Sequence, residues 1–155
     1  MNNQEISALL MRDSRARRVF RGVFPRDKLP EYVNGDASAY IINTDHSRGS
    51  GEHWVAVWFD GQGRAEYFDS FGLPPSIHNS VLNFIKRNSV NYSYNQRLFQ
   101  SLLSSACGLY VLYFVLMKSR GARLSRLQQV FDTFRLRAND ERVRVLVKNM
   151  LSRQR

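Results

Sequence analysis

The sequence predicts an α+β fold, a small mixed, mostly antiparallel sheet packed by helices. Two apolar segments, residues 39–43 and 53–59, have the length and composition of buried strands. Asp60-Gly-Gln-Gly63, typical of a β-hairpin turn, follows the second segment. A nine-residue apolar run, residues 109–117, indicates a buried central helix. The 155 residues suffice for one domain with its own hydrophobic core.

The N-terminal part is expected to begin with an amphipathic helix over residues 4–12. Ile6, Leu9 and Leu10 recur there at helical spacing. An arginine-rich segment leads from this helix to residues 27–36, which contain proline and glycine and are predicted to form a loop.

The middle of the chain is expected to supply the sheet and one helix. A turn-rich loop, residues 45–51, separates the two apolar strands, and residues 65–70 return from the hairpin as a third. A helix over residues 76–88 would bury one face, made of Ile77, Val81, Phe84 and Ile85. Alternation then predicts a further strand that includes Tyr92, Tyr94 and Gln96.

The central helix carries the only cysteine of the chain, Cys107, in its predicted first turn. Ser104 or Ser105 is the expected N-cap, and Gly121 is the expected C-cap. Unpaired N–H groups and the helix dipole at such an end stabilise an anion, so they favour a thiolate. The alternative is that a lone cysteine on an apolar helix is an inert core residue.

Two helices are predicted after the central one. Ser125 and Gln128 form a capping-box pattern that opens the first of them. Its expected buried residues are Leu127, Val130, Phe131 and Phe134. The last helix is expected to start at Asn139 and to bury Val143, Leu146, Val147 and Met150.

Charge divides the chain into a basic N-terminal segment (1–28), a near-neutral core (29–117) and a basic helical C-terminal part (118–155). The formal net charge is +10. Basic ends fit contact with phosphate backbones, although a solvated basic surface explains them equally well. The first DNA-binding candidates are Arg15, Arg17, Arg18, Arg120, Arg123 and Arg126.

Composition also argues against several classes of protein: disulfide-bonded, cysteine-rich metal-binding, membrane-spanning and secreted ones. One cysteine makes no internal disulfide and no cysteine-rich metal site, and it fits a reducing compartment. No apolar run reaches the length of a membrane span, and the first ten residues lack a secretory signal pattern. We therefore expect no metal cofactor, no membrane contact and no secretion.

Three residues could serve a catalytic cysteine. His53 opens the second strand and is the candidate base, whereas His46 and His78 lie in a polar loop and at a helix start. Asp69, at the end of the returning strand, could orient His53. Gln100, seven residues before Cys107, could help bind an oxyanion.

Along the chain these residues come in the order His, Asp, Gln, Cys. The motifs around them resemble those of the adenovirus endopeptidase (adenain) family, within the clan that includes the ubiquitin-like-protein proteases. The likeness rests on His53-Trp54, Tyr67-Phe-Asp-Ser-Phe-Gly72, and Gln100 before Ala106-Cys-Gly-Leu109. It covers residues 18–117. Asp69 departs from the pattern, because adenain-like sequences have Glu there and the eukaryotic relatives commonly have Asp.

The resemblance implies a role for each matching residue. Cys107 would be the nucleophile, His53 the general base, Asp69 its orienter and Gln100 the oxyanion donor. Trp54, Gly51 and Gly108 would contact the substrate.

As an adenain-type cysteine endopeptidase, the chain would cleave viral capsid or core precursors at glycine-containing sites. It would act as a monomer in the virion and the host cell interior, with the nucleus as the expected compartment and DNA as a cofactor. A disulfide-linked peptide activator is excluded for want of a second cysteine, whereas a non-covalent one stays open. Two alternatives stand: a protease that removes ubiquitin-like modifiers, and a non-catalytic basic DNA-binding protein.

Overall fold

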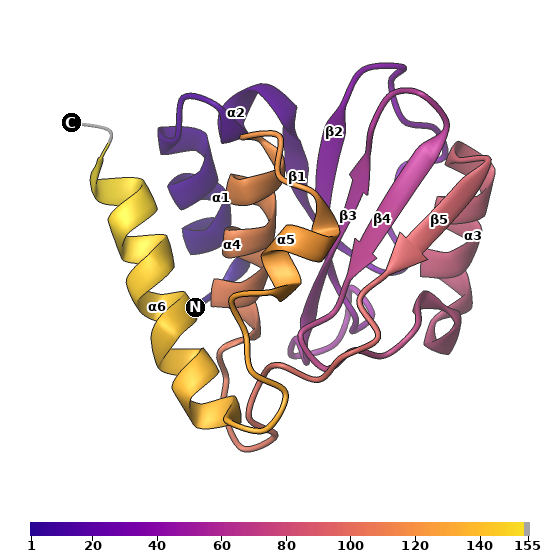
Figure 1. Ribbon diagram of the computed structural model, residues 1–155. Helices are drawn as coiled ribbons and strands as arrows, with labels where there is room; N and C mark the ends of the chain where they lie inside the picture. The colour runs from indigo at the N-terminus through magenta and orange to yellow at the C-terminus, as the bar shows by residue number, and fades with distance from the viewer. Residues whose placement is uncertain (154–155) are drawn as a thin grey trace.

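The computed structural model describes residues 1–153. It has one five-stranded sheet in the order β1-β2-β3-β4-β5 (Figure 1). The strands are β1 (Phe20–Pro25), β2 (Ser38–Asn43), β3 (Trp54–Phe59), β4 (Arg64–Phe68) and β5 (Asn91–Tyr94). The central strands β2, β3 and β4 pair antiparallel, while β1 and β5 run parallel to their neighbours at the two edges. The predicted α+β class with a small mixed sheet is confirmed.

Helices cover both faces of the sheet (Figure 1). The helical elements are α1 (Asn3–Arg12), α2 (Ala16–Val19), η1 (Pro75–Ile77), α3 (Asn79–Asn88), α4 (Cys107–Lys118), α5 (Leu124–Gln128) and α6 (Leu136–Ser152). Helix α3 packs on one face through Val81, Phe84 and Ile85. Helix α4 packs on the other, with α1 and α6 outside it.

Helix α4 is central because it is apolar on all sides, and such a helix is stable only when it is surrounded. Leu112, Phe114 and Leu116 are fully buried between the sheet and the outer helices. Each buried side chain of this size contributes about 1.5–3 kcal/mol. The helix start, and with it Cys107, is thus held in a fixed position relative to the strand ends.

Residues 20–25, for which the sequence predicted no element, form strand β1; Phe20, Val23 and Phe24 pack along it, and an irregularity between Phe20 and Gly22 interrupts its pairing with β2. The predicted cap at the start of α4 was wrong. The N-cap of α4 is Ala106, and neither serine caps it through its side chain. The predicted glycine cap at the other end is confirmed: Gly121 has φ +81°, and the N–H groups of Gly121 and Ala122 donate to the carbonyls of Lys118 and Met117, the Schellman pattern that ends a helix.

The C-terminal helices also differ from their predictions. The expected capping box at Ser125 is absent, since α5 starts at Leu124 after Arg123, which makes no side-chain cap. Phe134 lies in the connection to α6 and is 94% exposed, and Ile77, in η1, is 52% exposed. The sequence predicted both on a buried helix face. However, α5 already ends at Gln128, and Ile77 belongs to the short helix η1, which ends before α3 begins.

The three charge-defined parts of the chain share one hydrophobic core. Ile6 of α1, Ile41 of β2 and Val143 of α6 are fully buried in the same cluster. Within residues 1–153, no helix combines the length and the apolar character needed to span a bilayer.

Candidate active site

Cys107, His53 and Asp69 lie at the ends of three different elements and meet where the central strands β3 and β4 adjoin the start of α4. Cys107 is the first residue of α4, His53 directly precedes β3, and Asp69 directly follows β4. The predicted hairpin brings the last two together, because β3 and β4 pair antiparallel with Ala56 opposite Phe68. Cys107 is 5% exposed and the side chain of His53 is 14% exposed.

The carboxylate of Asp69 fixes the orientation of the His53 ring. His53 Nε2 lies 2.7 Å from Asp69 Oδ1, an arrangement in which the ring N–H donates to the carboxylate. The same oxygen accepts from the backbone N–H of Phe71 at 2.9 Å. The Phe71 ring stacks on the imidazole, with centroids 4.6 Å apart and planes 24° apart. Nδ1 is therefore the ring nitrogen left for the thiol.

The charges of the cluster stabilise a thiolate–imidazolium pair. Burial acts to lower the pKa of His53, but hydrogen bonds to Asp69 and Cys107, together with their negative charges, raise it to about 9. Burial acts to raise the pKa of Cys107, but the hydrogen bond and charge of His53 and the backbone N–H groups of Trp54 and Gly108 lower it below its usual value. A thiolate so held is the reactive form of a cysteine.

A buried asparagine holds Asp69 in place, a role that was not identified from the sequence. Asn95 is fully buried; its Oδ1 accepts from the Asp69 N–H at 2.9 Å and its Nδ2 donates to the Asp69 carbonyl. Asn95 lies just past β5, within the alternating segment assigned to a strand. Its only sequence signal is a polar residue beside the strand, which does not distinguish a buried asparagine from a solvated one.

Gln100 is buried and held by two side-chain hydrogen bonds. Its Oε1 accepts from Ser70 Oγ at 2.6 Å, and its Nε2 donates to the Ser104 carbonyl at 2.8 Å. Its backbone N–H also bonds to the Ser70 carbonyl, 3.1 Å away. Because an amide nitrogen has two hydrogens, one remains for a further acceptor. Ser70, the residue that orients this amide, was likewise not identified from the sequence.

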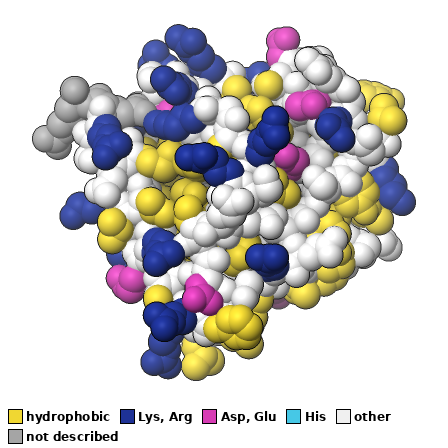
Figure 2. All heavy atoms as spheres, viewed as in Figure 1, with side chains coloured by type: hydrophobic (Ala, Val, Ile, Leu, Met, Phe, Trp, Pro, Cys, Tyr) yellow, Lys and Arg dark blue, Asp and Glu magenta, His cyan; other side chains and the backbone are white. Residues whose placement is uncertain are grey.

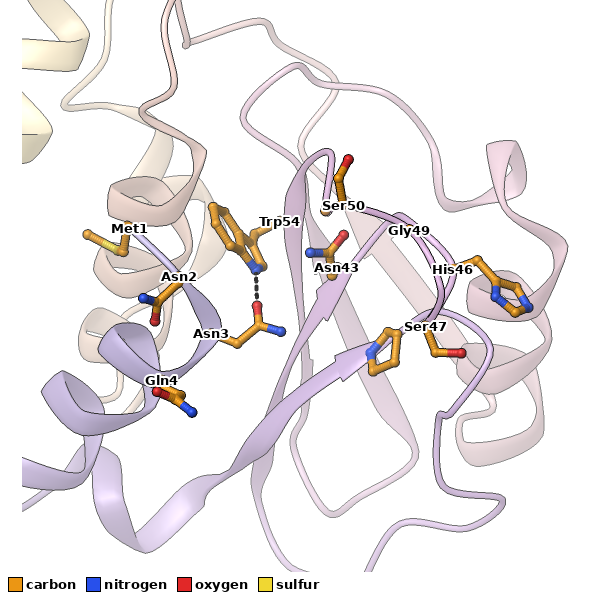
Figure 3. A pocket seen from close by; sticks show the side chains of 12 residues that line it. Met1, Asn2, Asn3, Gln4, Asn43, His46, Ser47, Gly49, Ser50 and Trp54 are labelled. Atoms are coloured by element: carbon orange, nitrogen blue, oxygen red, sulfur yellow. Dashed lines mark hydrogen bonds between the residues drawn. The ribbon is translucent and has the colours of Figure 1, made fainter.

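Trp54 and Gly51 line one cavity of about 470 Å³ between the start of α1 and the 46–51 loop (Figure 3). The indole Nε1 of Trp54 donates to Asn3 Oδ1 at 2.8 Å. Gly51 has φ +88°, and a Cβ there would lie 2.9 Å from Asn43 Nδ2. Only glycine suits that backbone conformation, and it leaves the loop backbone open to the cavity.

The two other histidines have other hydrogen-bond and ion-pair partners, although the charges of Asp69 and His53 also act on His78. His46 pairs with Asp27 at 3.1 Å, and the His78 ring accepts from Arg26 at 3.3 Å. Burial, followed by the charge of Arg26, lowers the pKa of His78. His53 is the histidine that contacts both Cys107 and a carboxylate.

The six arginines chosen as DNA-binding candidates are not equivalent. Arg120 lies 2.7 Å from the buried Asp13 carboxylate and also donates to the Leu116 carbonyl, so it serves the fold. The other five are exposed. The ion pair joins the turn between α1 and α2 to the segment just after α4. Figure 2 shows basic side chains spread over the visible face, between hydrophobic and uncharged ones. No group of three or more His, Cys, Asp or Glu among residues 1–153 could hold a metal ion.

A cysteine paired with a carboxylate-held histidine at a helix start is the arrangement of thiol hydrolases. The family model of the Ulp1 protease family, C-terminal catalytic domain, matches residues 29–150. The chain therefore belongs to the Ulp1 protease family, whose members are cysteine peptidases. No curated protein matches the chain significantly.

Solved structures show the same fold at low sequence identity. The ASFV pS273R protease has a TM-score of 0.64 and 18% identity, over 92% of this chain and 65% of that one. The SUMO protease Ulp1, with its catalytic cysteine oxidised to a sulfinic acid, has a TM-score of 0.52 and 15% identity, over 97% and 78%. The central domain of Lpg1148 from Legionella pneumophila has a TM-score of 0.50 and 18% identity, over 99% and 97%.

These comparisons confirm the clan-level resemblance, while the narrower likeness to adenain stays a prediction. In a second ASFV pS273R structure, the matched region spans 43% of the viral chain, at 23% identity and a TM-score of 0.50. This chain thus spans less than two thirds of the viral protease it matches.

Proposed function

We propose that the chain is a cysteine endopeptidase that cleaves viral precursor proteins at glycine-containing sites. One observation carries the proposal: the His53 ring, fixed by Asp69 at 2.7 Å, contacts the thiol at the start of α4. The thiolate attacks the scissile carbonyl carbon, whose π electrons move to oxygen. His53 then gives its proton to the leaving amine as the C–N bond breaks.

Deacylation reverses these roles. Water attacks the thioester formed on Cys107 while His53 accepts one of its protons. The C–S bond then breaks, the product leaves as the carboxylic acid with the water's oxygen and other hydrogen, and the Cys107 thiolate re-forms beside protonated His53. In both steps negative charge develops on an oxygen beside the start of α4. The backbone N–H of Cys107 and the remaining Nε2 hydrogen of Gln100 are the donors we assign to it.

Replacing Gln100 with alanine should lower kcat by about 10²–10³-fold, as expected when an oxyanion donor is removed. KM should change little, because the donor acts on charge that develops during the reaction. Steady-state kinetics test this, with the melting temperature as the control for folding. A change confined to KM would contradict the assignment.

Glycine-containing substrates fit the confined surroundings of Cys107, because a substrate backbone without a side chain can come closest to the thiol. Viral precursors are favoured by the adenain-like motifs and by the TM-score with the viral protease, 0.64 against 0.52 for Ulp1. Removal of ubiquitin-like modifiers is the second candidate, because the matching family model is that of Ulp1.

The two candidates differ in what they need to recognise. A precursor protease should cleave short peptides with the motif that the adenain resemblance implies, hydrophobic-X-Gly-Gly or hydrophobic-X-Gly-X. A deconjugating enzyme should instead react with a whole modifier that carries a C-terminal vinyl sulfone. Labelling by the modifier probe without peptide cleavage would overturn our first choice.

We also propose that DNA binds the exposed arginines around α2 and α5. Replacing Arg17 and Arg18 with alanine should weaken DNA binding for all sequences alike. The slope of log K against log salt should become shallower by about 0.9 for each phosphate that the variant no longer neutralises. Titrations at several salt concentrations measure it, and an unchanged slope would contradict the proposal. Arg120→Ala is unsuitable, because it would remove a charged partner of the buried Asp13 carboxylate and so lower the stability of the fold.

A further inference from the structure

The first three residues of the chain lie against the start of α4 and against Trp54. A Cβ on Gly108 would lie 2.9 Å from Met1 Sδ and 3.5 Å from Met1 Cβ. The Met1 side chain is 20% exposed, whereas the whole residue, with its terminal backbone atoms, is 48% exposed. Asn3 Oδ1 accepts from the Trp54 indole at 2.8 Å, as Figure 3 shows. Residues 1–3 thus contact the neighbours of both Cys107 and His53.

This segment is firmly anchored. Asn2 caps α1 reciprocally with Glu5: each backbone N–H donates to the other side chain, at 2.8 and 2.9 Å. Ile6 and Leu10 fix the rest of the helix, since both are fully buried. Residues 1–3 therefore have a definite place in the fold.

Met1 also lies between two cavities. The first, of about 470 Å³, includes Trp54 and Gly51, and the second, of about 700 Å³, includes Ser105 and Ala106. Met1 lines both. Cys107 and His53 line neither cavity, but their chain neighbours Ala106 and Trp54 do. A polypeptide that occupies both cavities therefore crosses the Met1 side chain, which lies against Gly108, the residue after Cys107.

We propose that Met1 and Asn3 form the outer wall of a narrow passage at Cys107, and that Met1 is the specificity-determining residue restricting the acylated residue to glycine. The substrate part of this inference rests on the proposed function. A side chain on the acylated residue would have to enter the space that the Met1 thioether fills. Glycine needs no such space. Asn3 holds the wall to Trp54 on the opposite side.

A test without substrate compares two thiol reagents, iodoacetamide and the bulkier fluorescein maleimide, on Cys107. Met1→Gly is made by cleaving an N-terminal fusion so that glycine is residue 1, and the reference protein with Met1 is made the same way. Alkylation by the maleimide should become about tenfold faster, a typical effect of pocket size. Iodoacetamide should be affected less than about twofold.

Two further variants sharpen this test. Asn3→Ala should move the ratio of the two rates in the same direction by removing the bond to Trp54. Met11→Ala, at an exposed methionine on the same helix, should leave the ratio unchanged. If Met1→Gly accelerates alkylation by both reagents equally, or by neither, the proposal that Met1 narrows the access to Cys107 is wrong.

The substrate test uses two peptides that differ only in glycine or alanine at the acylated position. The reference protein should favour glycine, and Met1→Gly should reduce that preference by about tenfold in kcat/KM. An unchanged preference overturns the role of Met1 in specificity. If the reference protein cleaves neither peptide, the proposed function fails, while the reagent ratio still decides whether the wall exists.

Discussion

Replacing Cys107 with alanine should lower peptide hydrolysis by about 10⁴-fold or more, because the acyl intermediate forms on its sulfur atom. The fold should persist, since the change removes one sulfur atom from an otherwise apolar helix and costs about 1 kcal/mol. Steady-state hydrolysis of a glycine-containing peptide measures the loss, and thermal unfolding measures the stability.

Cys107→Ser is the matched variant, with almost the same shape and a much weaker nucleophile. It should be as inactive as Cys107→Ala while it binds substrate normally. Retained cleavage in either variant would show that another residue is the nucleophile. An inactive wild type would instead favour the non-catalytic interpretation of this basic chain.

Asp69→Asn should produce the second-largest loss, about 10²–10⁴-fold in kcat/KM. The amide preserves the size of the side chain but removes the charge that holds the His53 pKa near 9. The imidazolium then gives up its proton at lower pH, and the thiolate is left without its partner. A kcat/KM profile against pH should show its alkaline limb moved to lower pH.

Asp36→Asn, which removes a carboxylate at an exposed position, is the control for net charge. It should leave the profile unchanged. An Asp69→Asn enzyme with wild-type kinetics would contradict the role of Asp69 as the orienting carboxylate. An Asp69→Glu enzyme should recover part of the activity, because the longer side chain restores the charge at a slightly different reach.

The parts of the site that follow from local sequence were predictable. The hairpin turn at Asp60–Gly63 reverses the chain, so the approach of Asp69 to His53 follows from two strands of known length. The place of Cys107 follows from the apolar run that begins just after it. Both depend on short-range patterns that sterics and hydrophobicity impose.

The contacts between segments distant in sequence were not predictable. Asn95 bonds to Asp69 across 26 positions, and Ser70 to Gln100 across 30. Asn3 and Trp54 are 51 positions apart. A polar residue that is buried and satisfied has the same local sequence signature as a solvated one, so only the packed fold identifies it. Phe134 is the converse case, a large apolar residue that the fold leaves exposed.

The most direct test of the central claim is the rate of Cys107 alkylation by iodoacetamide as a function of pH, in wild type and in His53→Ala. The lowered pKa of Cys107 and the His53 pKa of about 9 predict a reactive ion pair between those two values. Below the lower value the thiolate is protonated. Above the upper value His53 gives up its proton and the ion pair no longer exists. Wild type should therefore react fast well below the free-thiol pKa of about 8.5, and His53→Ala should react only near that value. Identical profiles, each with an ordinary thiol pKa, would contradict the catalytic pair.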